Sequence, residues 1–358
     1  MRRLLNAVSG IGPLDDEAMR AVRERQGRLT KPAGSLGRLE ELSVQLAGIT
    51  ACASPQVRQR AIIVMAGDHG VTAEGVSAYP QEVTPQMVYN FVRGGAAINV
   101  LARHAGARVV VVDAGVAAEL EPHPMILSRR VAAGTRNLAA GPAMTYEQAI
   151  ACLEVGIDVV DAEVARGLEL VGTGDMGIGN TTASSAIVAA ITGAPVKDVT
   201  GRGTGLDERQ LAHKVKVIER ALEVNRPNPA DPIDVLAKVG GFEIGGLAGV
   251  MLGAACRRIP VVIDGFISGA AALIATELCP RVRDYLIAAH SSVEIGHRVL
   301  LEHMELVPLL NLNLRLGEGT GSALAMLLVD ASTRILCEMA TFEEAGVSGR
   351  RQPASENA

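Results

Sequence analysis

The stretch Ala61-Ile-Ile-Val-Met-Ala66, which runs directly into Gly67-Asp-His-Gly70, decides the fold. Its apolar character is continuous rather than alternating, as is typical of a strand that is covered on both faces in a parallel sheet. In open parallel sheets, ligands bind beyond the carboxyl ends of the strands. The stretch therefore predicts a buried parallel strand whose polar end, with Asp68 and His69, lies near a binding site.

Four further β-branched runs repeat this pattern, and each ends near Gly, Asp or Ser. They are residues 108–113, 168–171, 259–263 and 284–289. Helical patterns lie between the runs, at residues 145–166, 181–192, 207–224, 243–256 and 292–304. Alternating strands and helices predict an α/β fold with a doubly wound, mainly parallel, Rossmann-like sheet.

The two ends of the chain differ from this middle part. Residues 14–28, 36–51 and 322–340 have helical patterns, and no clear strand precedes residue 60. We therefore expect residues 1–58 and 330–358 to form a small helical domain. Residues 59–329 would form the large α/β catalytic domain.

Composition excludes several classes of protein. The 358 residues carry a net charge of −5, with no Trp, four Phe and four Tyr, so neither a basic surface nor stacking platforms for nucleic acid are expected. The five cysteines are scattered without a CxxC pair, which favours a reducing, cytoplasmic location. The most apolar segment, residues 244–256, is too short to span a bilayer, so no membrane association is expected.

Glycine-rich segments supply the candidate chemistry. Arg315-Leu-Gly-Glu-Gly-Thr-Gly321 places Glu318 among three glycines before a helical pattern, either facing a ligand or complementing the helix dipole. Gly172-Thr-Gly-Asp-Met-Gly177 matches the GxGxxG pattern of dinucleotide sites, although no acid follows at a clear strand end. Asn180 or Thr181 is suited to cap the next helix, whose start would bind phosphate.

Other polar residues allow two interpretations each. Gly201-Arg-Gly-Thr-Gly205 and Lys214 could hold a phosphate or form a solvated helix face. His69 is interpreted as a hydrogen-bonded loop histidine, and Ser291 and Ser292 as ligand contacts at a strand end. The sequence contains neither an HExxH motif nor a GxSxG motif, so we expect no metal site and no nucleophile elbow.

Six motifs in matching order resemble one known family across nearly the whole chain. The family is nicotinate-nucleotide–dimethylbenzimidazole phosphoribosyltransferase, which activates the lower ligand of cobalamin. The motifs are Lys31-Pro-Ala-Gly-Ser-Leu-Gly-Arg-Leu-Glu40, Gly67-Asp-His-Gly-Val71, Gly174-Asp-Met-Gly-Ile-Gly-Asn-Thr-Thr182, Lys238-Val-Gly-Gly-Phe-Glu243, Asp264-Gly-Phe266 and Arg315–Gly321.

The resemblance implies transfer of phosphoribose from nicotinate mononucleotide to 5,6-dimethylbenzimidazole, with inversion at the anomeric carbon. The products would be α-ribazole 5′-phosphate and nicotinate. It also implies a homodimer that needs neither cofactor nor metal. The family's catalytic base falls on Glu318, and Asp175 would stabilise charge on the sugar, although some relatives carry Glu at that position.

The remaining site residues follow from the same resemblance. The base pocket would be lined by Tyr79, Met87, Met176 and Leu316, and adaptable methionines suit a flat apolar ring. Some relatives have Ser and Gln in place of Tyr79 and Met87, so the preferred base does not transfer. Phosphoribosyl and nicotinate contacts would come from Gly177, Arg202, Gly203, Lys214, Asp264, Gly265, Ser291 and Gly317.

Two alternatives belong to other functional classes. An NAD(P)-dependent oxidoreductase would use Gly172–Gly177 and would bind NADH tightly. A non-catalytic nucleotide-binding protein of the same fold would bind nicotinate mononucleotide without turnover. The intact Glu318 argues against the second alternative, because a silent relative has no need of a general base.

Overall fold

The computed structural model describes residues 1–203 and 205–348. The chain forms two compact units, the first from Met1–Pro13 with Arg58–Leu327 and the second from Leu14–Val57 with the chain from Leu328 onward. The structure differs from the predicted domains at residues 1–13, which pack in the first unit because helix α1 (Arg2–Gly10) contacts α6 and α11. The predicted domain's last residues, 349–358, lie outside the described residues.

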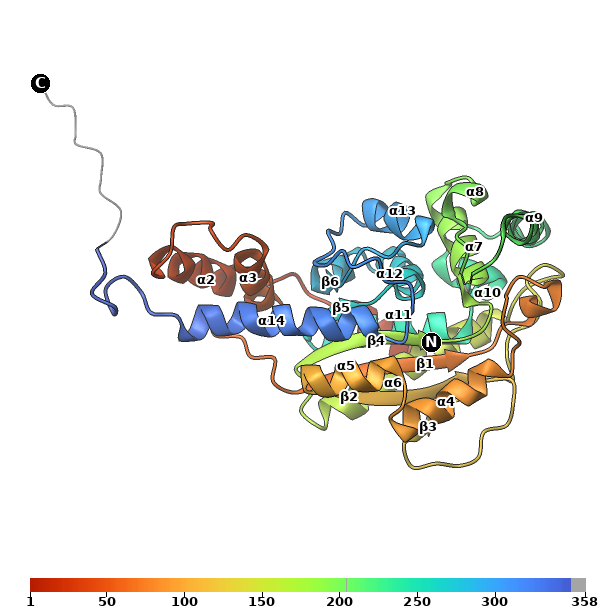
Figure 1. The fold of residues 1–358 in the computed structure, drawn as a ribbon, viewed down its shortest axis with the longest axis horizontal. Helices are drawn as coiled ribbons and strands as arrows, with labels where there is room; N and C mark the ends of the chain where they lie inside the picture. Colours follow the sequence, from red (N-terminus) through yellow and green to blue (C-terminus); the bar gives the residue numbers. More distant parts are fainter. Residues whose placement is uncertain (204, 349–358) are drawn as a thin grey trace, which may run out of the picture. The chain divides into compact units, whose positions relative to one another are not determined.

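A six-stranded parallel sheet forms the middle of the first unit (Figure 1). Its order is β3-β2-β1-β4-β5-β6, so the strand order reverses between β1 and β4, where doubly wound sheets bind ligands. The predicted α/β fold is confirmed, and one edge strand, β3, was missed. The strands are β1 (Arg60–Gly67), β2 (Ala107–Gly115), β3 (Ile126–Ser128), β4 (Leu170–Met176), β5 (Val261–Ile263) and β6 (Leu286–Ala288).

Helices cover both faces of this sheet. Those of the first unit, after α1, are α4 (Val83–Arg93), α5 (Ala97–Ala105), α6 (Tyr146–Val164), α7 (Asn180–Thr192), α8 (Val196–Val199), α9 (Glu208–Asn225), α10 (Pro232–Val239), α11 (Phe242–Cys256), α12 (Phe266–Leu278) and α13 (Ile295–His303), with 3₁₀ turns η1 (Gly70–Glu74) and η2 (Pro280–Tyr285). The second unit contains α2 (Asp16–Arg28) and α3 (Arg38–Thr50). Helix α14 (Thr320–Glu338) begins in the first unit and ends in the second.

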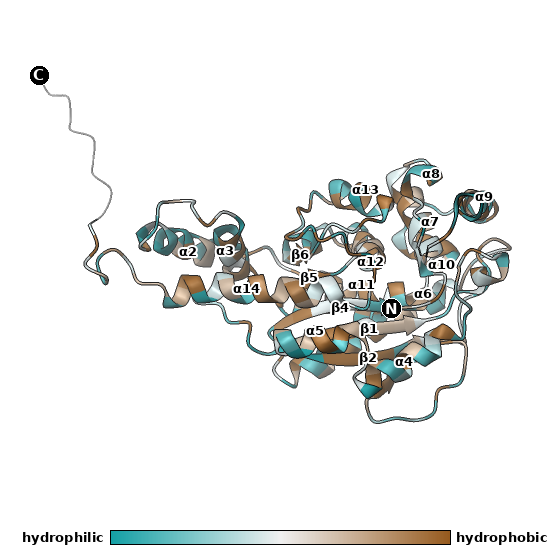
Figure 2. Cartoon of the chain, viewed as in Figure 1, coloured by the Kyte–Doolittle hydropathy of each residue, from teal (hydrophilic) through white to brown (hydrophobic). Residues whose placement is uncertain are grey.

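Side chains of β1 alternate between two helical layers, as a strand requires. Met65 points to α11, where its Sδ would lie 3.0 Å from a Cβ on Gly246. Ile62 points to the opposite face, toward Gly319 just before α14. The sheet is therefore covered on both sides, which explains the continuous apolar run. Figure 2 shows the strands mainly brown and the exposed helix α9 largely teal.

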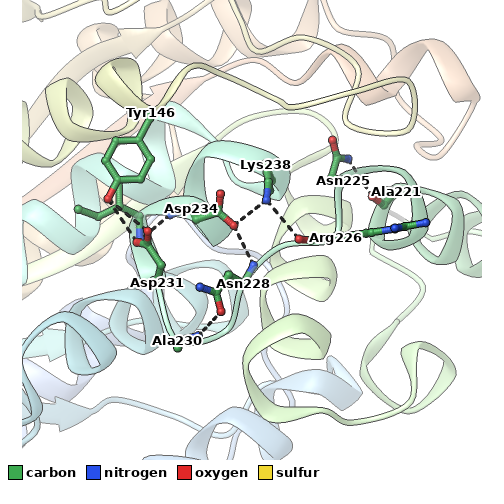
Figure 3. Close-up of polar contacts among 10 residues, drawn as sticks. Tyr146, Ala221, Asn225, Arg226, Asn228, Ala230, Asp231, Asp234 and Lys238 are labelled. Carbon is green, nitrogen blue, oxygen red and sulfur yellow. Dashed lines mark hydrogen bonds and ion pairs between the residues drawn. The ribbon is translucent and has the colours of Figure 1, made fainter.

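The motif that begins at Lys238 starts with a structural residue (Figure 3). Lys238 Nζ donates to Asp234 Oδ2 at 2.8 Å and to the Arg226 carbonyl at 3.2 Å, which ties α10 to the end of α9. At the other end of α10, Asp231 accepts the backbone N–H groups of Ile233 and Asp234. These contacts fix the entry of α11, which carries Glu243.

The second unit contains the first family motif. Lys31 is buried and pairs with Glu40 across 2.8 Å, so the ion pair closes the loop between α2 and α3. Helix α14 is the one helix among the described residues that is long and apolar enough to cross a membrane, and 56% of that window is buried in the protein. Core helices of soluble proteins have the same properties.

Candidate active site

A cavity of about 690 Å³ lies at the carboxyl ends of the strands in the first unit. It brings together most of the predicted site residues, from segments that are far apart in sequence. Those that line it are Tyr79, Met87, Asp175, Met176, Gly177, Gly203, Gly265, Leu316, Gly317 and Glu318. The predicted residues Arg202, Lys214, Asp264 and Ser291 are not part of the lining.

Glu318 stands in an unusual backbone conformation. Its φ angle is +62°, and the φ angles of Gly317 and Gly319 are +82° and +95°. A non-glycine residue in the left-handed region stores strain that the surroundings must hold, and such residues cluster at active sites. The carboxylate is buried and accepts the N–H of Ile98, in the first turn of α5, at 3.2 Å. Burial raises the pKa of Glu318, and this hydrogen bond opposes the rise, so the group is a stronger proton acceptor than an exposed glutamate.

The turn that carries Glu318 lies directly on strand β4. A Cβ on Gly174 would come within 2.3 Å of the Glu318 carbonyl oxygen, so only glycine permits this approach. Ser322 Oγ donates to the carbonyls of Thr173 and Val262, at 3.1 and 2.8 Å. The GxGxxG match is therefore not a dinucleotide loop, because Gly172 and Gly174 lie inside β4 and make room for the segment that carries Glu318.

Asp264 is buried beneath the same turn. Its Oδ2 accepts the N–H of Gly319 at 3.0 Å, and its Oδ1 accepts those of Gly321 and Ser322 at 2.7 and 3.1 Å. Burial raises the pKa of Asp264 to about 7 against these three hydrogen bonds, and the charge of Glu318 adds to the rise. In the described part of the chain, Asp264 thus contacts the protein's own backbone, whereas the sequence predicted a substrate contact.

Asp175 closes the floor of the cavity. Its Oδ2 accepts the amide of Asn180 at 3.0 Å, and its buried Oδ1 has no hydrogen-bond partner among the described residues. Burial raises the pKa of Asp175 well above its usual value, and the nearby carboxylates of Asp264, Glu243 and Glu318 add to the rise. The expected capping of α7 by Asn180 or Thr181 is wrong, because the N-cap residue is Gly179 and the Asn180 side chain turns to Asp175.

Two family motifs meet behind this floor. His69 Nε2 lies 2.6 Å from Glu243 Oε1, and both side chains are fully buried. Burial lowers the pKa of His69, but the charge and hydrogen bond of Glu243 outweigh it, so the pKa is raised overall. A Cβ on Gly67 would lie 2.8 Å from Glu243 Oε2, and one on Gly241 would lie 2.4 Å from the His69 ring. The pair of His69 and Glu243 therefore packs directly against the backbone at Gly67 and Gly241.

The two predicted phosphate-binding cations have different environments. Lys214 is buried, its Nζ donates to Thr181 Oγ1 at 2.7 Å, and burial lowers its pKa to about 8. Arg202 is exposed and turns away to pair with Glu208 at 2.8 Å. The N–H of Gly203 is already bound by Glu294 Oε1 at 3.0 Å. Of the two cations, Lys214 is thus the one beside Thr181 and Gly203 of the cavity wall.

The apolar wall is open to solvent on one side. Tyr79 and Leu316 are 55% and 58% exposed, while Met87 and Met176 are half-buried. Exposed large apolar side chains at the rim of a polar cavity are typical of a site that takes up an apolar ligand.

His290, Ser292 and Glu294 also line the cavity. Ser292 was predicted as a ligand contact together with Ser291, whereas His290 and Glu294 were missed. Side chains alternate along an extended chain, so His290 and Ser292 share one side after β6 and Ser291 points to the other. This alternation was a usable signal. Glu294 had none, because an acid is unexpected beside a loop that was predicted to bind phosphate. In residues 1–203 and 205–348, no three His, Cys, Asp or Glu side chains are placed to hold a metal ion.

Comparison with known proteins gives consistent results. Residues 11–347 match a family model described as Phosphoribosyltransferase. A relative from Chloroflexus aggregans, named nicotinate-nucleotide–dimethylbenzimidazole phosphoribosyltransferase, is 60% identical over 98% of this chain and 100% of its own length. One of the same name from Roseiflexus sp. is 62% identical over 98% of this chain and 99% of its own. A solved structure of this name from Thermus thermophilus superimposes with a TM-score of 0.89 at 48% identity, covering 94% of this chain and 100% of that one.

Proposed function

The chain belongs to the nicotinate-nucleotide–dimethylbenzimidazole phosphoribosyltransferase family, and from this we infer that it transfers phosphoribose from nicotinate mononucleotide to 5,6-dimethylbenzimidazole. The products are α-ribazole 5′-phosphate, nicotinate and a proton. The observation that carries the assignment within the site is the buried Glu318 carboxylate, which shares one cavity with an apolar wall and with glycine turns.

We assign to Glu318 the role of general base. One nitrogen of the benzimidazole forms a bond to the anomeric carbon while the bond from that carbon to the nicotinate nitrogen breaks. The ribosylated ring is then cationic, and its other N–H becomes acidic. A positioned carboxylate of raised pKa can accept that proton, which is worth about 10²–10⁴ in rate.

The leaving nicotinate needs no acid, because its ring nitrogen becomes neutral as the bond breaks. Asp175 is proposed to face the sugar, where negative charge stabilises an oxocarbenium-like carbon. Burial, together with the neighbouring carboxylates, raises its pKa and so disfavours the ionised form in the free protein. A bound pyridinium would favour the ionised form, because an opposite charge nearby lowers the pKa of an acid.

We assign the other contacts by their places in the cavity wall or directly beside it. Tyr79, Met87, Met176 and Leu316 would receive the base, and Lys214 with Thr181 would receive the phosphate. The first unit would therefore contain the catalytic machinery. A homodimer in the cytoplasm that binds neither nucleic acid nor membranes is part of the same proposal, and sedimentation of the purified protein tests the oligomeric state.

The decisive assay mixes the protein with nicotinate mononucleotide and dimethylbenzimidazole, and follows nicotinate release and the ribosylated base by chromatography. Glu318→Gln should lower turnover at least ~100-fold while substrates still bind, because it removes the proton acceptor and little volume. Asp175→Asn should cost less. A near-normal rate in Glu318→Gln would refute its role, and a larger loss in Asp175→Asn would mean that the two roles are reversed.

A further inference from the structure

The Glu318 turn cannot hold its conformation by itself. Three successive residues, Gly317, Glu318 and Gly319, have positive φ angles, and the middle one carries a side chain. Such a residue costs about 1–3 kcal/mol and persists only when its surroundings over-determine it. The turn therefore needs fixed partners on both sides of Glu318.

The hydrogen-bond partners of the backbone differ between the two sides of Glu318. On the amino-terminal side, the carbonyl of Gly317 accepts the hydroxyl and the N–H of Thr320, at 2.9 and 3.1 Å, which are contacts within the turn itself. On the carboxyl-terminal side, the three N–H groups of Gly319, Gly321 and Ser322 all donate to the carboxylate of Asp264. Asp264 directly follows β5 of the sheet.

We propose that Asp264 is a positioning residue, which fixes the Glu318 carboxylate in the cavity by binding the backbone on its carboxyl-terminal side. The proposal rests on the proposed function, because it assumes that Glu318 acts as the base. Asp264 is 1% exposed and is not part of the cavity lining, so it acts through Glu318 and not by touching the substrate.

Both carboxylate oxygens are needed for this role. In Asp264→Asn, the amide group must replace one of them. If it replaces Oδ2, it faces the N–H of Gly319, the residue directly after Glu318. If it replaces Oδ1, it faces the N–H groups of Gly321 and Ser322. Either orientation sets donor against donor, which leaves buried N–H groups without a partner and moves the turn.

The test is a double-mutant cycle of Asp264→Asn and Glu318→Gln, with kcat and KM measured for each variant. A displacement of about 1 Å costs up to ~10² in rate, so Asp264→Asn alone should lower kcat about 10- to 100-fold with KM for both substrates changed less than about threefold. In the Glu318→Gln background, the same substitution should lower kcat by less than about twofold, because the group that it positions is already lost.

Asp113→Asn is the matched control. Asp113 is also a buried aspartate at a strand end, accepts the N–H of Val116 at 2.9 Å and does not line the cavity. The substitution Asp113→Asn should leave kcat within about twofold of the value for the unmodified protein. If Asp264→Asn does not fold, Asp264→Glu, which displaces both acceptors by one methylene, replaces it in the same cycle.

The proposal is overturned if Asp264→Asn lowers kcat by the same factor with Glu318 and with Gln at that position. It is also overturned if Asp264→Asn alone keeps kcat within about twofold of the unmodified protein. Failure of the proposed function is distinguishable, since the unmodified protein would then form no ribosylated base and Glu318→Gln would change nothing.

Discussion

Gly174→Ala offers a direct test of the turn geometry. A Cβ at this position would lie 2.3 Å from the carbonyl oxygen of Glu318, 2.6 Å from its carbonyl carbon and 2.9 Å from the nitrogen of Gly319. All three are backbone atoms, so no side-chain rotation relieves the overlap. Either β4 or the turn must move.

The size of the displacement follows from these distances. Ordinary van der Waals contact begins near 3.4 Å, so the closest atom must retreat by 3.4 − 2.3, about 1 Å. A misplacement of 1 Å costs up to ~10² in rate, and overpacking costs about 1–3 kcal/mol in stability. We therefore expect kcat to fall about 30- to 100-fold in a protein that still folds.

Gly172→Ala is the control from the same strand. Its Cβ would meet Met326 Cε at 2.8 Å, Ser322 Cβ at 3.0 Å and Ile62 Cγ1 at 3.2 Å, which are side-chain atoms. Denaturant unfolding of both variants gives the stability change, and steady-state kinetics give kcat and KM. The reasoning is refuted if Gly174→Ala keeps more than about half of the original kcat, or if both variants lose kcat equally at equal stability.

Two further predictions concern titratable groups. Burial lowers the pKa of Lys214 to about 8, so KM for nicotinate mononucleotide should rise as the pH passes about 8 and the ammonium loses its proton. In Lys214→Met, KM should be higher and nearly independent of pH. A pH-dependent KM in that variant would contradict the assignment. Glu243 raises the pKa of His69 by more than burial lowers it. The pair therefore stabilises the fold fully at pH values below the pKa of about 6.5 that His69 has in the unfolded chain. This contribution is lost as the pH rises through the pKa of His69 in the folded protein. Urea unfolding should therefore show a destabilisation by Glu243→Gln that is largest near pH 6 and shrinks toward pH 9, and a difference that grows with pH would refute the pairing.

The fold could be predicted because burial on both faces leaves a signal in the sequence. Each of the five expected runs contains a strand, and the edge strand β3 was missed because none of its three residues is buried. Helices α1, α4, α5, α8, α10 and α12 were also missed. The first five have 11 residues or fewer and leave only a short pattern, and α12 is buried along almost its whole length, so it has no polar face.

Most of the residues predicted for the site lie around one cavity, but their contacts could not be predicted. Glycines in the loops indicated where the backbone can come close to a ligand, and four of them line the cavity: Gly177, Gly203, Gly265 and Gly317. Long-range hydrogen bonds leave no local pattern, so nothing near Asp264 indicated that its partners lie 55 to 58 residues further on. For the same reason, the sequence could not distinguish Arg202, which faces solvent, from Lys214, which is buried.

The electrostatics of the cavity bear on the direction of the proposed reaction. The pKa values of Asp175, Asp264 and Glu318 are all raised, chiefly by burial, and within the described residues no lysine or arginine forms an ion pair with them. Backbone and amide N–H groups hold these acids instead, and such donors do not compete with a cation for the carboxylates. A cationic pyridinium is therefore favoured at this place. Its departure as nicotinate, which is anionic, turns attraction into repulsion. The same acids that draw the donor in would thus expel the first product, while Glu318 remains the acceptor for the proton that the second product must lose.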